Sequence, residues 1–394
     1  MDRIEPTITQ LYGSGFGVLG QPNFTTRGSN LTQNGLYLYH TNSFFIDSSG
    51  NAWVADYGNA RVLMYVPPFS NGMNASLVLG QSSFTTNTEA TTQNGLQNPS
   101  SVFIDSSGNA WVADHDNNRV LMYVPPFSNG MNASLVLGQS SFTTNAFATT
   151  QSGLYSPYSV FIDSSGNAWV ADHDNSRVLM YVPPFSNGMN ASLVLGQSSF
   201  TTNARPTTQN GLQNPSSVFI DSAGNAWVAD YGNSRVLMYV PPFSNGMNAS
   251  LVLGQSSFTT NTEATTQNGL FYPVSVFIDS FGNAWVADYN NSRVLMFAPP
   301  FSNGMNASLV LGQSSFTTNA AATTQNGLNG ASSVFIDSFG NAWVADYGNN
   351  RVLMYVPPFS NGMNAGSSTN SLYGSVVYPR KNIFYNPKAG VVKI

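Results

Sequence analysis

The chain has 394 residues and no cysteine, which excludes disulfides, thiolate nucleophiles and cysteine-ligated metals. Charged residues make up only 8% of the sequence and the formal net charge is −5, so the basic stripe of a nucleic-acid-binding protein is missing. No apolar run reaches the roughly 18 residues that a membrane-spanning helix needs, which excludes a transmembrane segment.

Tryptophan marks an internal repeat. The six tryptophans are spaced 58 residues apart, at Trp53, Trp111, Trp169, Trp227, Trp285 and Trp343. Self-similarity at a fixed period means that each copy forms one structural unit, so length alone does not set the number of domains.

Within the second copy, short β-branched and aromatic runs alternate with Gly, Pro and Asn turns. This pattern predicts four strands per copy, over residues 101–105, 109–114, 119–124 and 133–139. Gly108 stands where a tight turn requires a positive φ, and Pro125 and Pro126 end the third strand. No i, i+3, i+4 pattern persists, so helices are not expected.

The predicted strands are apolar on both faces, as in a sheet packed between two other sheets. Six four-stranded antiparallel sheets stacked radially about an axis satisfy this condition. The predicted fold class is therefore all-β, a six-bladed β-propeller whose tryptophans pack between the blades.

The fourth-strand sequence VLGQ predicts how the ring closes. It is absent after Pro358 in the sixth copy but occurs at the front of the chain, at residues 18–21. We expect the strand within residues 14–22 to complete the last blade and remove its open edge. The predicted organisation is an N-terminal lead (1–13), a propeller (14–365) and a C-terminal tail (366–394), which holds every lysine.

The segment GNAWVADHDNNRVLMY resembles the NHL repeat, which has a Gly-Asn turn, an aromatic-Val-Ala-Asp strand, an Asn-rich turn and an Arg-Val strand. The resemblance covers six copies, from about residue 14 to residue 365. It implies a six-bladed propeller.

Differences between the copies concentrate in two places, the turn after the second strand and the loop that joins one copy to the next. Hairpin reversal places both on the same side of the disc, which we call the top face. Variable loops on a rigid scaffold are typical of binding sites. The predicted ligand-binding residues are the first residues of the six turns, Tyr57, His115, His173, Tyr231, Tyr289 and Tyr347, supported by Tyr37, Tyr155, Tyr158, Phe271 and Tyr272. The alternative is that these rings cap the strand ends as apolar plugs.

Two sets of six aspartates recur. Those from Asp47 to Asp337 are expected to fix the first hairpin turns, and those from Asp56 to Asp346 precede an arginine by five residues, which predicts structural ion pairs.

His115 and His173 are each followed by aspartate, but two surface turns of this sequence explain them better than a shared metal site. We predict no catalytic residue, no metal and no cofactor, so the protein is not expected to be an enzyme.

N-glycosylation sequons recur in the turn between the third and fourth strands. The candidate acceptors are Asn74, Asn132, Asn190, Asn248 and Asn306, with Asn23, Asn30 and Asn290 elsewhere. Together with the low charge, they favour an extracellular or cell-surface protein, although the N-terminus MDRIEPTITQ shows no signal peptide.

The sequence thus predicts a non-enzymatic surface propeller that recognises a glycan or a protein through its top face. The alternative is a structural building block of a surface layer or filament, which self-associates through the disc and the tail.

Overall fold

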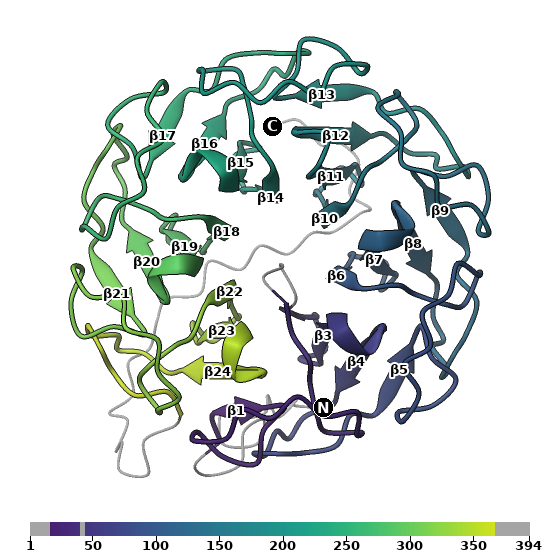
Figure 1. Ribbon diagram of the computed structural model, residues 1–394, viewed down its shortest axis with the longest axis horizontal. Helices are drawn as coiled ribbons and strands as arrows, with labels where there is room; N and C mark the ends of the chain where they lie inside the picture. Colours follow the sequence, from purple (N-terminus) through teal and green to yellow (C-terminus); the bar gives the residue numbers. More distant parts are fainter. Residues whose placement is uncertain (1–15, 40–43, 367–394) are drawn as a thin grey trace, which may run out of the picture.

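The structure, a computed structural model, describes residues 16–39 and 44–366. Six four-stranded antiparallel sheets stand radially around a central axis (Figure 1). The six-bladed β-propeller predicted from the sequence is confirmed. The outer lead (1–13) and residues 367–394 of the predicted tail lie outside the described residues.

Within each blade the four strands lie side by side, in order from the axis to the rim of the disc. The innermost strands are β2 (Phe44–Ile46), β6 (Pro99–Ile104), β10 (Pro157–Ile162), β14 (Pro215–Ile220), β18 (Pro273–Ile278) and β22 (Ala331–Ile336). The second strands are β3 (Ala52–Asp56), β7 (Ala110–Asp114), β11 (Ala168–Asp172), β15 (Ala226–Asp230), β19 (Ala284–Asp288) and β23 (Ala342–Asp346). The third strands are β4 (Arg61–Tyr65), β8 (Arg119–Tyr123), β12 (Arg177–Tyr181), β16 (Arg235–Tyr239), β20 (Arg293–Phe297) and β24 (Arg351–Tyr355). The outer strands are β5 (Leu77–Leu79), β9 (Leu135–Leu137), β13 (Leu193–Leu195), β17 (Leu251–Leu253), β21 (Leu309–Leu311) and β1 (Val18–Leu19).

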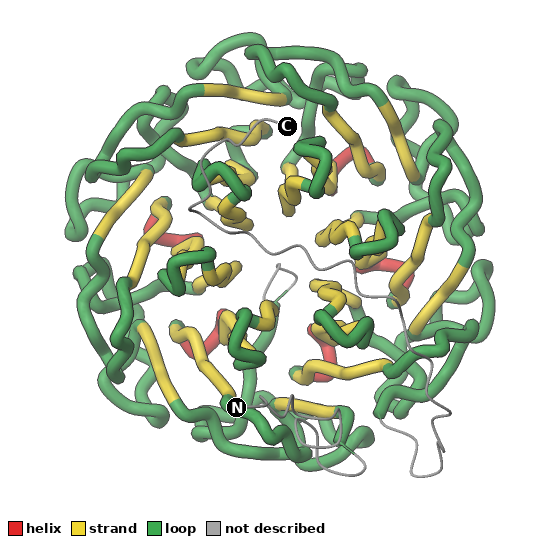
Figure 2. Tube along the Cα trace, turned by 180° about the vertical axis from the view of Figure 1, so that it is seen from behind, coloured by secondary structure: helices red, strands yellow, loops and turns green. Residues whose placement is uncertain are grey.

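Five of the six turns on the top face form a single turn of 3-10 helix. These are η1 (Tyr57–Asn59), η2 (His115–Asn117), η3 (Tyr231–Asn233), η4 (Tyr289–Asn291) and η5 (Tyr347–Asn349). Figure 1 views the disc from the top face, and Figure 2 shows the opposite face, which we call the bottom face.

The outer strands are shorter than the sequence predicts. β9 begins at Leu135 rather than at residue 133, because Ala133 pairs with the joining loop instead of with β8. The Ala133 amide donates to the Gln93 carbonyl at 2.9 Å, and the Gln93 side-chain amide donates back to the Ala133 carbonyl at 2.8 Å. Only part of each joining loop therefore lies on the top face, and its TTQ segment reaches the turn before the outer strand.

The N-terminal strand closes the ring. β1 pairs antiparallel with β24, with Val18 opposite Leu353 and Leu19 opposite Val352; the purple strand lies beside the yellow one in Figure 1. Asn71 of the first blade also accepts hydrogen bonds from the Gly17 and Val18 amides. The last blade is thus completed by the start of the chain, as predicted.

Tryptophan forms the contact between neighbouring blades. Each tryptophan is at most 1% exposed, and each packs against the phenylalanine that follows the two prolines of the next blade. The ring centres of Trp111 and Phe185 lie 5.1 Å apart, and Trp343 meets Phe69 of the first blade at 5.7 Å. The prediction that the tryptophans are core residues is confirmed.

Six phenylalanines surround the axis. Phe45, Phe103, Phe161, Phe219, Phe277 and Phe335 each contribute one ring from an innermost strand. Neighbouring ring centres lie 4.6 to 5.1 Å apart around the complete circle. Valines from the same strands line the small cavity beside them. The middle of the disc is therefore filled by aromatic side chains.

The closing strand generates the first prediction. Val18 and Leu19 are fully buried, and burial of such a side chain contributes about 1.5–3 kcal/mol. Deleting residues 1–22 should lower the free energy of unfolding by at least about 3–6 kcal/mol, the sum for these two side chains, and expose the β24 edge to aggregation. Chemical denaturation and light scattering measure both effects, and a chain lacking only residues 1–15 is the control because it keeps β1. Equal stability of the two truncated chains would contradict the closure.

Five buried tyrosines generate the second prediction. Among the described residues, the hydroxyls of Tyr65, Tyr123, Tyr181, Tyr239 and Tyr355 have no hydrogen-bond partner. The equivalent residue of the fifth blade is Phe297. An unpaired buried hydroxyl costs about 1–3 kcal/mol, so Tyr239→Phe should raise the melting temperature. The reciprocal change, Phe297→Tyr, should lower it. A loss of stability in Tyr239→Phe would show that the hydroxyl is paired.

Candidate functional site

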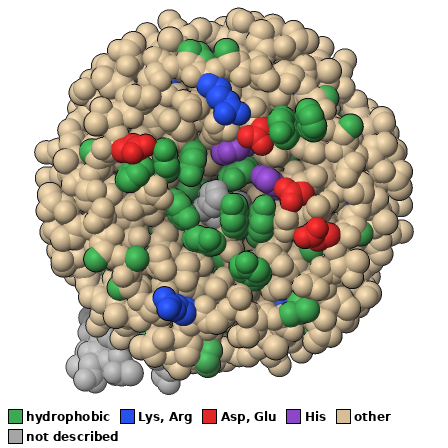
Figure 3. All heavy atoms as spheres, in the orientation of Figure 1, with side chains coloured by type: hydrophobic (Ala, Val, Ile, Leu, Met, Phe, Trp, Pro, Cys, Tyr) green, Lys and Arg blue, Asp and Glu red, His purple; other side chains and the backbone are tan. Residues whose placement is uncertain are grey.

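The six predicted ligand-binding residues lie on one face, around the axis. Tyr57, His115, Tyr231, Tyr289 and Tyr347 begin the 3-10 turns, and His173 begins the corresponding turn of the third blade. Hydrophobic side chains and both histidines gather around the centre of this face (Figure 3). His173 is 8% exposed and the other five are partly buried. The rings are thus more deeply set than free surface side chains.

Residues from the joining loops complete this aromatic set. Tyr39 stacks on Tyr57 at 4.4 Å and meets Tyr347 edge-on at 5.7 Å. Tyr272 stacks on Tyr231 at 4.6 Å. We call the six turn residues with Tyr39, Tyr158 and Tyr272 the aromatic ring of the top face. Many of its ring faces are covered by neighbouring members.

Three tyrosines of the aromatic ring, Tyr57, Tyr231 and Tyr289, are neutral hydrogen-bonding groups. Burial raises the pKa of Tyr231 to about 12, and burial also raises the pKa values of Tyr57 and Tyr289 above the usual value. Each hydroxyl therefore keeps its proton in the physiological range and can both donate and accept a hydrogen bond.

A buried ion pair positions each turn and the loops beside it. In the second blade, Arg119 Nε lies 2.7 Å from Asp114 Oδ2, and both side chains are fully buried. Arg119 Nη2 donates to the carbonyls of Thr92 and Gly95 in the incoming loop, and Nη1 donates to the Phe142 carbonyl in the outgoing loop. The predicted structural pairing of these aspartates and arginines is confirmed in all six blades.

The aspartate of this pair also fixes the backbone just before the innermost strand. Asp114 Oδ1 accepts a hydrogen bond from the Gln97 amide at 2.7 Å, and Oδ2 accepts one from the Asn117 side chain at 2.9 Å. Burial raises the pKa of the Asp114 carboxyl, and Arg119 together with these hydrogen bonds opposes the rise. The top-face loops are thus fixed to the rigid strands through charged hydrogen bonds.

The two histidine side chains do not lie against one another. Tyr158 lies between them, 3.9 Å from the His173 ring in a parallel stack and 5.0 Å from the His115 ring. His115 Nδ1 instead pairs with the carboxylate of Asp116. Within residues 16–39 and 44–366, no three His, Asp or Glu side chains come together as metal ligands.

The second set of aspartates fixes the hairpin turns of the bottom face, as predicted. Asp105 Oδ1 accepts hydrogen bonds from the Ser107 and Asn109 amides, and Oδ2 accepts one from Trp111 Nε1, each at 2.9 Å. The same arrangement recurs in the other five blades. These carboxylates are therefore structural.

The recurrent sequons lie on accessible turns. The five asparagines Asn74, Asn132, Asn190, Asn248 and Asn306 are exposed, and so is the serine two residues after each of them. Asn23 and Asn30 are also exposed. Asn290 is only partly exposed and its Ser292 is buried, accepting a hydrogen bond from the Gly330 amide. The Asn290 sequon is therefore the least accessible.

Sequence reasoning did not identify Tyr39 as part of the top-face set. The repeat pattern gave no signal for it, because Tyr39 lies in the loop of the first blade, where LYLYH departs from the other copies. The structure shows its stacking on Tyr57 directly.

Among the described residues, no helix has the length and apolar character needed to cross a bilayer.

No family model matches the chain. Over 140 residues the sequence is 27% identical to the human NHL repeat-containing protein 3; this match covers 33% of the chain, and the chain spans about a third (35%) of that protein. An auxiliary nutrient binding protein from Bacteroides ovatus superposes with a TM-score of 0.53 at 11% identity, over 87% of this chain and 77% of that one.

A structural genomics protein of unknown function from Bacteroides thetaiotaomicron superposes with a TM-score of 0.55 at 13% identity, over 86% of this chain and 75% of that one. These similarities confirm the resemblance to NHL-repeat β-propellers. At such identities the solved structures show the fold alone.

Asp116 generates a pH-dependent prediction. Partial burial raises the pKa of its carboxyl, but hydrogen bonds from His115 and Asn98 outweigh burial and hold the pKa below its usual value. Such a carboxyl stabilises the fold above its unfolded-state pKa of about 3.9, and this contribution is lost as the pH falls through the lower folded-state pKa.

Asp116→Asn should therefore be less stable than the unmodified protein at neutral pH. Because the carboxylate is one-third exposed, we expect a difference of at most about 1 kcal/mol. Denaturant titrations at decreasing pH should show the gap closing below about pH 4. A gap that is constant across this range would contradict a charge contribution from Asp116.

Proposed function

We propose that this propeller is a non-enzymatic binding protein that recognises a glycan through its top face. The observation that carries the proposal is the aromatic ring of the top face, in which partly buried rings gather around the axis and carry neutral hydroxyls. Ligand sites commonly combine an apolar surface with a few positioned polar groups. A sugar has the complementary surface, with C–H groups on its faces and hydroxyls on its edges.

The distribution of sequence differences supports the same face. The scaffold elements of the six blades repeat with few changes, whereas the turns and joining loops of the top face differ from blade to blade. The buried Asp–Arg pair holds these loops in every blade. A fixed frame with variable loops is the arrangement expected of a recognition surface.

The proposed location is outside the cell or on its surface. Five exposed sequons on one type of turn support this location, because modified asparagines must be accessible. The predominance of Asn, Ser, Thr and Gln over charged side chains also fits a surface that interacts with uncharged ligands.

Self-association is the second candidate function, and the bottom face favours it. Val66, Val124, Val182 and Val240 are exposed at equivalent positions, and Phe281 is 72% exposed. Exposed apolar patches mark interaction surfaces. Sedimentation of the purified chain over a range of concentrations distinguishes this candidate, because a building block of a layer or filament forms oligomers through the disc.

Replacement of Tyr231, Tyr289 and Tyr347 by alanine should abolish retention on a glycan array. Because these rings contact neighbouring aromatic side chains, the triple variant should also melt at a lower temperature while keeping the propeller fold. The triple Tyr→Phe variant preserves the stacking and removes only the hydroxyls, so it should stay stable and bind more weakly. A folded alanine variant with full retention would contradict the proposed face.

A further inference from the structure

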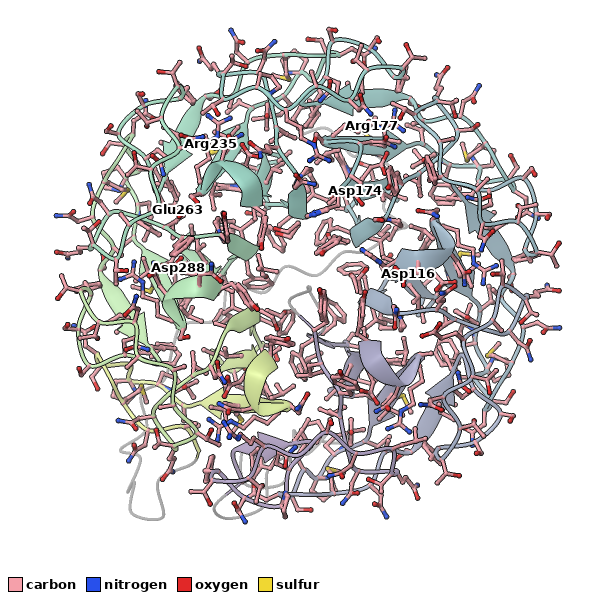
Figure 4. All side chains as sticks on the ribbon, viewed as in Figure 1. Asp116, Asp174, Arg177, Arg235, Glu263 and Asp288 are labelled. Atoms are coloured by element: carbon pink, nitrogen blue, oxygen red, sulfur yellow. The ribbon has the colours of Figure 1, made fainter. Side chains whose placement is uncertain are left out.

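The top face departs from six-fold symmetry in its charges. Apart from the buried ion pairs and the hairpin aspartates, Glu89, Asp116, Asp174 and Arg205 lie in the blades 2 to 4 sector together with both histidines. Figure 4 shows Asp116 and Asp174 in one sector of the disc and Glu263 in another. One sector of the face thus carries most of the charged side chains outside the buried ion pairs and the hairpin turns.

An exposed aromatic platform stands in this sector. Phe147 is 64% exposed and stacks on Tyr155, with ring centres 4.5 Å apart and planes 23° from parallel. Tyr155 is held by its amide, which donates to Asp172 of the buried ion pair at 2.7 Å. The outer face of Phe147 is therefore supported from behind and open to solvent.

An aspartate and an arginine lie beside the platform. The Asp174 amide donates to the Tyr155 carbonyl at 3.2 Å, which joins the turn of the third blade to the platform. Arg205 Nη2 lies 3.9 Å from Asp174 Oδ1 and donates to the Asp174 carbonyl at 3.5 Å. The Arg205 side chain is 50% exposed, so half of it is open to solvent. Basic, acidic and hydrophobic side chains lie next to one another in this sector in Figure 3.

Phe147 and Arg205 occupy the same position in two consecutive joining loops. The equivalent residues of the other loops are Ser29, Glu89, Glu263 and Ala321. The loop that carries the phenylalanine and the loop that carries the arginine therefore flank the same turn, that of the third blade. No other blade has this combination of side chains.

We infer that Phe147, Asp174 and Arg205 form the primary subsite of the top face, which binds one neutral pyranose ring. The apolar C–H face of the sugar packs on Phe147. Two neighbouring hydroxyls donate to the Asp174 carboxylate and accept from the Arg205 guanidinium, since each hydroxyl is both donor and acceptor. This subsite rests on the proposed function, because it names the sugar class and the residues of the same face.

The charge of the subsite selects for a neutral ligand. Asp174 and Arg205 cancel one another, and Asp116 of the neighbouring blade adds a negative charge. The remaining negative charge disfavours a carboxylated sugar, whereas an uncharged hexose uses both members of the pair.

Saturation-transfer NMR and titration calorimetry with methyl glucoside, methyl galactoside, methyl mannoside and methyl glucuronoside test the subsite. Phe147→Ala should weaken binding of the preferred neutral glycoside at least tenfold. It creates the sequence AAA, which the chain already carries at residues 320–322, so the loop keeps a natural sequence. Arg205→Ala and Asp174→Asn should each weaken binding at least fivefold.

Phe281→Ser is the matched control, because it removes an exposed phenylalanine from the bottom face and introduces the residue found in the second blade, Ser107. It should leave the affinity unchanged. Binding of the glucuronoside in preference to the neutral glycosides, or no binding of any of the four, would overturn the inference. If Phe147→Ala binds normally while the triple tyrosine variant does not, the subsite is wrong and the proposed function stands.

Discussion

The buried ion pair of each blade is the interaction on which the top face depends. One arginine reaches its aspartate, two carbonyls of the incoming loop and one carbonyl of the outgoing loop. Lysine has no planar fork of donors and cannot replace it. Removal of one member of such a pair leaves an uncompensated buried charge, which costs about 3–5 kcal/mol. The constancy of Asp and Arg in all six copies has this physical reason.

This arrangement separates the constant parts of the protein from the variable ones. The Asp–Arg pair holds the loops through their backbone carbonyls and amides, which are present whatever the side chain at a variable position. A change of side chain in a joining loop therefore leaves the supporting hydrogen bonds intact. Phe147, Arg205 and Glu89 can occupy equivalent positions on the same frame, so one side of the disc acquires different chemistry from blade to blade.

Much of the fold could be predicted from the sequence because it depends on local rules. Alternating strand and turn residues located the strands, and the displaced VLGQ segment located the closing strand. The aspartates five residues before arginine were correctly predicted to form ion pairs. The length of the outer strands was wrong, because Ala133 pairs with Gln93, forty residues earlier in the chain. No sequence pattern within one copy reports such a contact.

The candidate site was less predictable than the fold. The sequence indicates which residues begin the turns, but stacking between Tyr39 and Tyr57 depends on how far the first loop folds over its blade. The stacking of Phe147 on Tyr155 and the position of Arg205 beside Asp174 likewise depend on the loop path. The only signal in the sequence was that Phe147 and Arg205 each occur once at their repeat position.

The circle of six phenylalanines determines whether a molecule can pass through the disc along its axis. The six ring centres form roughly a regular hexagon whose sides, the distances between neighbouring ring centres, are 4.6 to 5.1 Å. In a regular hexagon the distance from the centre to a corner equals the side, so each ring centre lies equally far from the axis. Because carbon atoms keep roughly 3.5 Å from their neighbours, the rings leave no passage for a sugar or a hydrated ion along the axis. The axis of the disc is therefore not a channel. A molecule that binds on the top face must leave from that same face.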